Sequence, residues 1–187
     1  MRADAQRNRA RVLEAAETVL ARDGLSASMR AVAELAGVGV GTIYRQFPTK
    51  EALYQAILVG RLHRLAARAD ELAAAPDAGT AFFDFFTQVV EDATTKKVFA
   101  DALAASDLDP KAGAPDLRGR IETLLVNAQR QGTVRPDAQL PEVLGLLSAA
   151  CLAAQHHTWS DPLRTRTLSI LFDGLRHHAP TAERSEV

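Results

Sequence analysis

The sequence predicts an all-α protein, and two observations carry this prediction. Strand-like alternation of apolar and polar residues is missing, and glycine and proline interrupt the chain at intervals that suit helices. The 187 residues, of which 47% are apolar and 24% charged, are enough to bury a substantial core. We therefore expect a globular protein of helices, in one or two domains.

The first helices follow from their apolar spacing and their end signals. Residues 7–22 carry apolar side chains at three- and four-residue intervals, which predicts one amphipathic helix. Ser28 stands at the N-cap position of a second helix. Gly37 ends that helix, because glycine adopts the left-handed conformation there without a Cβ clash. Val38 and Ile43 then pack a short third helix against the second, in the pattern of a helix-turn-helix.

The rest of the chain predicts longer helices. Thr49 is the N-cap of a helix over about residues 50–74, which would connect an N-terminal head (residues 1–50) to a larger body (residues 51–187). Loops rich in Pro, Gly and Asp separate the later helices. These helices are expected over residues 81–94, 96–105, 116–131, 141–158 and 161–178.

The helix-turn-helix stretch resembles the TetR family of bacterial transcriptional regulators. It contains the run Gly41-Thr42-Ile43-Tyr44-Arg45-Gln46-Phe47, followed by Lys50-Glu51. The likeness is strong over about residues 7–58. It implies about nine helices, three in the head and six in the body. It also implies a repressor that leaves a palindromic operator in double-stranded DNA when a small-molecule ligand binds. A helical hairpin that only packs would leave Tyr44 and Lys50 unexplained.

Polar residues of the head predict the contacts with DNA. The resemblance implies that Tyr44 holds a phosphate, and Lys50 occupies a first helical turn, where the helix dipole disfavours a cation that lacks an external partner. Arg45 and Gln46 are candidates to read bases, because Arg pairs with guanine and Gln with adenine. The remaining candidates are Ser28, Arg30, Val40, Gly41 and Thr42.

Alternatives stay open for some of these residues. For Tyr44 the alternative is a core aromatic side chain. For Lys50 the alternative is a solvated surface charge. The N-terminal arginines either reach an adjacent groove or belong to a mobile arm; they are Arg2, Arg7 and Arg9.

The charge is unevenly distributed along the chain. Residues 1–68 hold 11 Lys and Arg against 6 Asp and Glu, whereas residues 69–187 hold 11 against 17. A basic head on an acidic body suits a DNA reader with a separate regulatory part. Chance fluctuation in surface charge is the competing explanation.

From its phenylalanine cluster at residues 82–86 through residues 89–103 and 117–137, the body resembles SbtR-like C-terminal domains of the same family. By this resemblance two copies of the last two helices would form a homodimer interface over residues 141–178. An intrachain core face is the alternative for part of each apolar stripe. The stripes consist of Leu144, Leu147, Ala150, Cys151 and Ala154, and of Leu168, Leu171, Phe172 and Leu175.

The same resemblance implies a body pocket for an unidentified small molecule. Spacing alone does not indicate one, since phenylalanines at helical spacing are usually core. The apolar candidates are Phe82, Phe86, Val89, Phe99, Leu103, Leu124 and Trp159, and the polar or polarizable ones are Asn127, Cys151 and Gln155.

Several classes of function find no support in the sequence. Zinc-site spacing, a phosphate loop and a nucleophile elbow are all missing, so we expect no enzyme, metal site or cofactor. A small-molecule or metal sensor whose DNA contact is secondary is the alternative function. The apolar runs are too short to span a membrane, and the N-terminus lacks the apolar core of a signal peptide. A cytoplasmic location is therefore expected.

Overall fold

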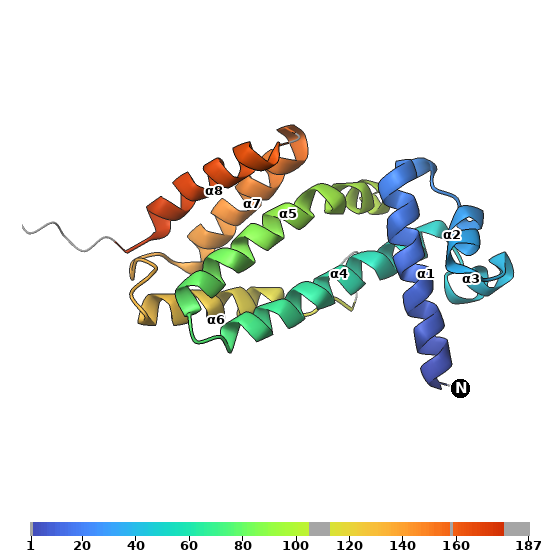
Figure 1. Cartoon of the computed structure of the whole chain (residues 1–187), viewed down its shortest axis with the longest axis horizontal. Coiled ribbons are helices and arrows are strands. Elements are labelled where there is room, and N and C mark those ends of the chain that lie inside the picture. Colours follow the sequence, from blue (N-terminus) through green and yellow to red (C-terminus); the bar gives the residue numbers. More distant parts are fainter. Residues whose placement is uncertain (1, 105–112, 158, 178–187) are drawn as a thin grey trace, which may run out of the picture. The chain divides into compact units, whose positions relative to one another are not determined.

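The computed structural model describes residues 2–104, 113–157 and 159–177 (Figure 1). Regular structure in these ranges is helical, which confirms the predicted fold class. The elements are α1 (Arg2–Asp23), a 3₁₀ turn η1 (Gly24–Ser26), α2 (Met29–Ala36), α3 (Val40–Gln46), α4 (Lys50–Ala73), α5 (Ala78–Ala104), α6 (Leu117–Arg130), α7 (Leu140–His157) and α8 (Asp161–Leu175). Of the helices in the ranges described, none is long and apolar enough to cross a membrane.

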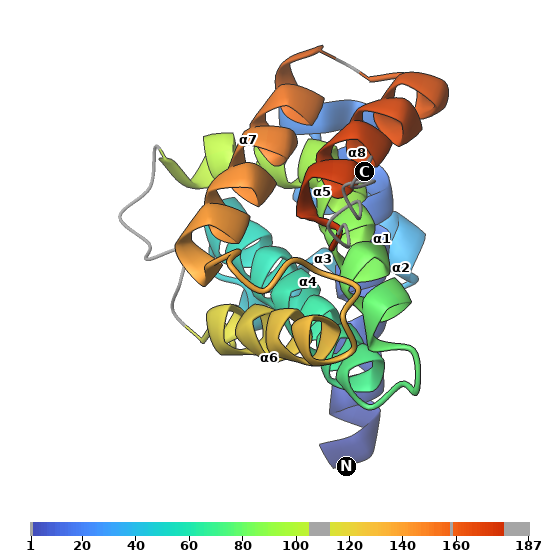
Figure 2. The same cartoon turned by 90° about the vertical axis from the view of Figure 1, so that its left-hand side faces the viewer.

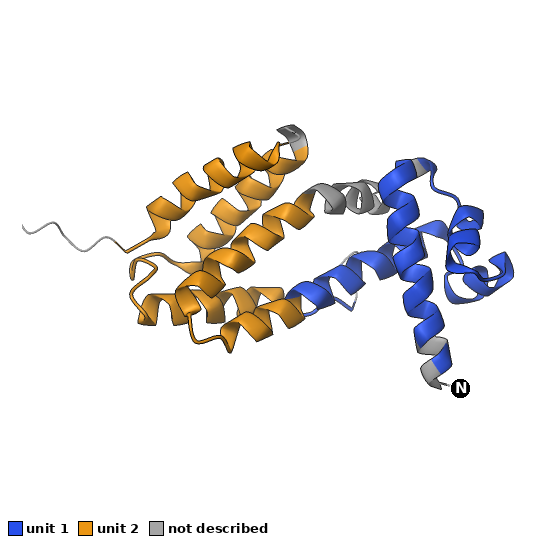
Figure 3. Ribbon diagram, viewed as in Figure 1, with its two compact units in different colours: residues 1–65, 94–115 blue, residues 66–93, 116–187 orange. Residues whose placement is uncertain are grey.

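The chain forms two compact units (Figure 3). The head unit consists of residues 1–65 and 94–115, and the body unit consists of residues 66–93 and 116–187. Both α4 and α5 therefore contribute residues to each unit. Compactness does not test function, so the division at residue 50 stays a prediction.

The head unit has its own apolar core, built by α1, α2, α3 and the first turns of α4. The α1 residues in this core recur at helical spacing, as one buried face requires. Ile43 of α3 is fully buried, and Phe47 directly after it is 2% exposed. The main core members are Val12, Ala16, Val19, Val32, Ala33, Ile43, Phe47 and Leu53.

End signals place α2 and α4 where the sequence predicts them. The Ser28 hydroxyl oxygen accepts a hydrogen bond from the Ala31 N–H at 3.1 Å, and Gly37 adopts a φ of 65°. The Thr49 hydroxyl oxygen likewise accepts from the Ala52 N–H at 3.1 Å. These N-caps and the left-handed glycine are confirmed.

Several helix boundaries differ from the prediction: α1 begins at Arg2 instead of residue 7, and two differences concern α5 and α8. α5 runs unbroken for 27 residues, where the sequence predicts two helices that meet near residue 95. Thr94 and Thr95 lower helix propensity only slightly, and no glycine or proline stands there to stop the helix. The described ranges therefore hold eight α-helices instead of about nine. α8 ends at Leu175, short of residue 178, because Arg176 pairs with Val134 as an isolated β-bridge.

An aromatic cluster fills part of the body unit. Phe82, Phe85 and Phe86 of α5 are buried. The rings of Phe86 and Phe172 meet edge to face at 5.4 Å, and that of Phe83 lies 4.7 Å from Phe172. α8 thus packs against α5 through Phe172 (Figures 1 and 2).

One side chain from the end of α6 holds the turn between α4 and α5. Gln131 Oε1 accepts hydrogen bonds from the backbone N–H groups of Ala78 at 2.9 Å and Gly79 at 3.3 Å, and its Nε2 donates to the Pro76 carbonyl at 2.8 Å. Asp77 caps the start of α5 by accepting hydrogen bonds from the Thr80 hydroxyl and N–H. Those two hydrogen bonds hold the pKa of Asp77 below its ordinary value.

Candidate nucleic-acid interface

α3 is a seven-residue helix with one buried side chain and an exposed outward side. Ile43 anchors it in the head core, while Gly41, Tyr44 and Arg45 are exposed. Tyr44 is 49% exposed, so it is not the core aromatic of the alternative reading. The outward side of α3 is therefore available for a partner.

Arg45 lies over the polar side of this helix. Its Nη2 donates a hydrogen bond to the Thr42 hydroxyl at 3.1 Å, one turn earlier. A guanidinium has five N–H donors in a rigid fork, so this bond leaves donors for the edge of a base. The arrangement suits the role in base reading that the sequence predicts for Arg45.

Gln46 is placed differently from its neighbour. Its side chain is half-buried, and Oε1 is shielded from solvent without a hydrogen-bond partner in the part of the chain that the structure describes. Arg45 therefore presents its polar group outward and Gln46 does not. Base reading by Gln46 stays a prediction.

The other predicted contacts lie around α3. Val40 and Thr42 are half-buried in its first turn, and Arg30 is exposed in the first turn of α2. Lys50 begins α4, with its Nζ 5.5 Å from the centre of the Tyr54 ring. The N-termini of α2 and α4 carry partial positive charge, which favours phosphates beside Ser28 and Lys50.

Two arginines of α1 contact the helix-turn-helix, and sequence reasoning did not find these contacts. The Arg9 guanidinium lies 4.6 Å from the centre of the Phe47 ring, and Arg11 Nη2 donates to the Ala36 carbonyl at 2.6 Å. α1 is helical from Arg2, so Arg9 belongs to a helix and not to a mobile arm. The signal available in the sequence was the helix period, which places Arg9 and Arg11 on the two sides of the direction in which Val12 points.

A group of ions joins α1 to α4 within the head unit. Glu17 accepts hydrogen bonds from Arg61 at 3.1 Å and from Arg64 at 2.6 Å, one through each carboxylate oxygen. The side chains of Arg61 and Glu17 are 14% and 22% exposed, so solvent screens this pair less than a surface pair. We call these three residues the Glu17 clasp.

In the body unit, the predicted pocket residues form part of the packing. Phe82, Phe86, Val89 and Leu124 are buried, and Trp159 is half-buried. The side chains of Phe99 and Leu103 lie outside the described residues. Their role in a pocket stays a prediction.

The three polar pocket candidates hydrogen-bond to backbone carbonyls. Asn127 donates to Ala73 at 3.4 Å, Gln155 donates to Ala93 at 3.1 Å, and the Cys151 thiol lies 3.8 Å from the Val89 carbonyl. These contacts tie α6 to α4 and α7 to α5. Among the described residues, no group of three or more His, Cys, Asp or Glu could hold a metal ion.

A hollow of about 200 Å³ lies in the body unit between α5 and α8. Glu91 and Arg164 form an ion pair at its wall, with a 3.3 Å separation. Its lining is amphipathic and consists of Thr87, Glu91, Arg164, Thr165, Leu168, Ser169, Phe172 and Arg176.

The apolar stripes of α7 and α8 are mostly core, and a homodimer interface over residues 141–178 stays a prediction. The chain itself buries Leu147, Ala150, Ala154, Leu168, Phe172 and Leu175. Other apolar side chains of the same helices are exposed, namely Leu146, Leu152, Leu163 and Ile170. The alternative of an intrachain core face is therefore right for these six residues, because the single chain already buries them.

Two family models match the chain. The one for bacterial regulatory proteins of the tetR family matches residues 12–57, and the one described as transcriptional regulator SbtR-like, C-terminal domain, matches residues 77–177. Together they cover most of both compact units.

Individual proteins agree with these matches. The solved TetR transcription regulatory protein from Mycobacterium vanbaalenii is 38% identical, with a TM-score of 0.77 over 94% of this chain and 98% of that one. The regulator UidR of Escherichia coli K12 is 29% identical over 73% of this chain and 74% of its own. The repressor KstR of Mycobacterium tuberculosis is 36% identical over 57% of this chain and 54% of its own. The chain therefore belongs to the TetR family of DNA-binding transcriptional regulators, with an SbtR-like C-terminal domain.

Proposed function

We propose that this protein is a homodimeric repressor that binds a palindromic operator and leaves it when a small molecule enters the body unit. The observation that carries the proposal is the asymmetry of α3, which fixes Ile43 in the core and turns Tyr44 and Arg45 outward. A short helix held from one side can enter the major groove with its other side.

Each exposed group has a proposed role. Arg45 reads a guanine edge, with Thr42 orienting its guanidinium. Tyr44 and Lys50 hold phosphates, and Ser28 and Arg30 meet the backbone at the start of α2. Gly41, which is exposed, lets the DNA backbone or a base approach α3 closely, and Val40 contacts a thymine methyl.

The dimer forms through the exposed side of α7 and α8. Leu152, Leu163 and Ile170 are each at least half exposed in the single chain, and Leu146 lies near them in sequence. Four large apolar side chains on two consecutive helices are costly to leave in water. A second copy covers them with the same four residues around a two-fold axis.

The ligand binds in the body unit. The hollow between α5 and α8 supports this proposal, because it combines the apolar wall of Leu168 and Phe172 with the charged pair Glu91 and Arg164. Phe86 of α5 packs against Phe172 at its wall, and Trp159 stands just before α8. α4 contains residues of both units, so it is the element through which ligand binding changes DNA affinity.

Selection of bound sequences from random DNA tests the proposed function. We expect an inverted repeat, with affinity for it at least a thousandfold above that for shuffled DNA at the same salt concentration. Equal affinity for both would contradict the repressor and favour a sensor whose DNA contact is secondary. Trp159 is the single tryptophan, so its fluorescence reports ligand binding to the body independently.

A further inference from the structure

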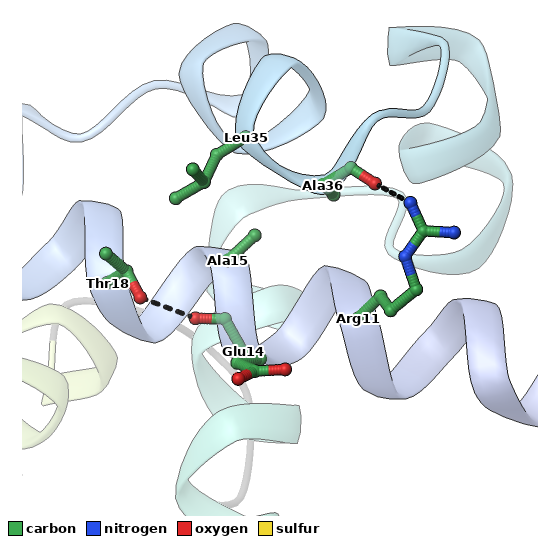
Figure 4. A pocket seen from close by; sticks show the side chains of 6 residues that line it. All are labelled: Arg11, Glu14, Ala15, Thr18, Leu35 and Ala36. Carbon is green, nitrogen blue, oxygen red and sulfur yellow. Dashed lines mark hydrogen bonds between the residues drawn. The ribbon is translucent and has the colours of Figure 1, made fainter.

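The turn of the helix-turn-helix is held from outside by Arg11. Its Nη2 donates to the carbonyl oxygen of Ala36, the last residue of α2, and Figure 4 shows the side chain reaching from α1 to this atom. The last carbonyls of a helix lack intrahelical partners and carry partial negative charge. Arg11 satisfies one of them with a cation. A Cβ at Gly37 would stand 3.1 Å from the same guanidinium nitrogen, so the fit around the turn is close.

The far end of α3 is held by Arg9. Its guanidinium stacks over Phe47, the residue that follows α3, at 4.6 Å from the ring centre. Phe47 is 2% exposed, and its N–H donates to the Ile43 carbonyl at 2.8 Å, so it is fixed to both the core and the helix. A cation over an aromatic face contributes a specific attraction there.

The two arginines flank the face of α1 that enters the core. Residues two apart on a helix point about 200° apart, and Val12, which is fully buried, points between Arg9 and Arg11. One arginine therefore reaches the end of α2 and the other reaches the end of α3. Between these two points lies the whole turn and the recognition helix.

We propose that Arg9 and Arg11 are positioning residues that fix the orientation of α3 for base reading. The proposal rests on the proposed function in one respect, that α3 reads DNA. Removing either contact lets α3 tilt or shift about Ile43, and bidentate base contacts tolerate little misplacement. Contacts to phosphates tolerate more misplacement, because the phosphate charge repeats along the DNA backbone and a flexible side chain can follow it.

The test compares Arg9→Met and Arg11→Gln with Arg22→Gln, all in the full chain. Arg22 is an exposed arginine of the same helix that pairs with its neighbour Asp23, so its loss matches the change in charge. Three quantities are measured for each variant. They are the affinity for the selected operator, the affinity for shuffled DNA as a function of salt, and amide hydrogen exchange in the absence of DNA.

We expect the ratio of operator affinity to shuffled-DNA affinity to fall about tenfold in Arg11→Gln, which loses a charged hydrogen bond, and by a similar factor in Arg9→Met, which loses a cation–π contact. Arg22→Gln should keep the ratio. The salt slope on shuffled DNA should stay the same, and exchange at residues 37–43 of the free protein should speed up.

Two results would overturn the proposal. A salt slope lower by about one, with an unchanged ratio, would make the arginines phosphate contacts. A lower melting temperature with an unchanged ratio well below melting would make them stabilising residues only. If Arg11→Gln does not fold, Arg11→Lys keeps one donor for Ala36 and should restore part of the ratio. If the wild-type protein selects no operator, the proposed function fails, and the exchange measurement still decides whether the arginines hold the turn.

Discussion

The head unit and the body unit bury their apolar residues in different ways. In the head, α3 inserts one side chain, Ile43, and leaves its other side to solvent. In the body, α5 buries one broad face along its length, with Phe82, Phe85 and Val89 among its residues. A short helix with one fully buried residue depends on its neighbours for orientation, whereas a long helix buried along a whole face is fixed by packing. The head is therefore the part whose function is sensitive to small contacts.

The largest expected effect comes from the exposed face of α7 and α8. Ile170→Arg places an unpaired cation in the proposed dimer interface, which is unfavourable by about 3–5 kcal/mol. The chain should stay folded, become a monomer and lose operator affinity, because two separate heads lack the effective concentration of linked ones. Sedimentation beside operator titration measures this.

A neighbouring pair of residues provides the control. Leu147 is buried within the chain and Leu146 is exposed. Leu147→Arg should unfold the body unit, while Leu146→Arg should weaken the dimer of folded chains. A folded monomeric Ile170→Arg protein with wild-type affinity for the full operator would refute the two-headed mechanism.

The next largest effect compares a buried residue of α3 with an exposed one. Ile43→Ala removes a fully buried side chain and should lower the free energy of unfolding by about 2–4 kcal/mol. Tyr44→Ala, one residue later, should change it by less than about 0.5 kcal/mol and still weaken DNA binding. Denaturant titration of both variants checks this. Equal losses of stability would mean that α3 is packed on both sides.

Arg45 and Lys50 should differ in what they do to DNA binding. Arg45→Ala should relax base preference at one operator position, by about 1–3 kcal/mol. Lys50→Ala should weaken binding to all sequences alike and lower the salt slope by about one. Selected-sequence logos and salt titrations separate the two outcomes. An unchanged logo in Arg45→Ala would move specificity to Thr42, Val40 or DNA shape.

The Glu17 clasp should matter more for coupling than for folding. Glu17→Gln keeps the side-chain size and loses the charge that Arg61 and Arg64 contact, so we expect a loss of about 1 kcal/mol in the free energy of unfolding. If α4 moves relative to α1 on ligand binding, the variant should also change the ligand concentration that releases the operator. Ligand titrations that match the wild-type curve would limit the clasp to stability.

The smallest effect concerns pH and the start of α5. Hydrogen bonds from Thr80 hold the pKa of Asp77 below its ordinary value, so Asp77 adds stability above its unfolded pKa of about 3.9. That stability is lost as the pH falls through the lower folded pKa. The melting temperature of Asp77→Asn should therefore be slightly lower than wild type at pH 7, and the difference should shrink as the pH falls below the unfolded pKa. A difference that stays constant as the pH falls would exclude this titration.

Sequence reasoning reached further in the head than in the body. Ser28, Gly37 and Thr49 are local signals, and each stands where the sequence predicts a helix end. The helix period then places Ile43 on the inward side of α3 and Tyr44 on its outward side. Local rules suffice there because each element is short and bounded by a cap or a glycine.

The body lacked such signals. Residues 78–104 carry no signal that marks a helix end, and the prediction wrongly divided this long helix into two. α7 carries small apolar residues on several of its faces, so composition did not show that Leu147 is buried and Leu146 is exposed. Contacts between distant residues were also hidden, including those of Arg11 with Ala36 and of Glu17 with Arg61. Side-chain reach across elements is a property of the folded chain and leaves no periodic trace.

Gln131 has a consequence for how the chain is assembled during synthesis. It supplies the acceptor for the first backbone N–H groups of α5, which precede it by 53 and 52 residues. The ribosome therefore releases the start of α5 well before the amide that completes it. Until then water or Asp77 must satisfy those groups, and this turn closes as a late event with a high contact order. The order of synthesis thus keeps the junction of α4 and α5 incomplete until residue 131 has left the ribosome.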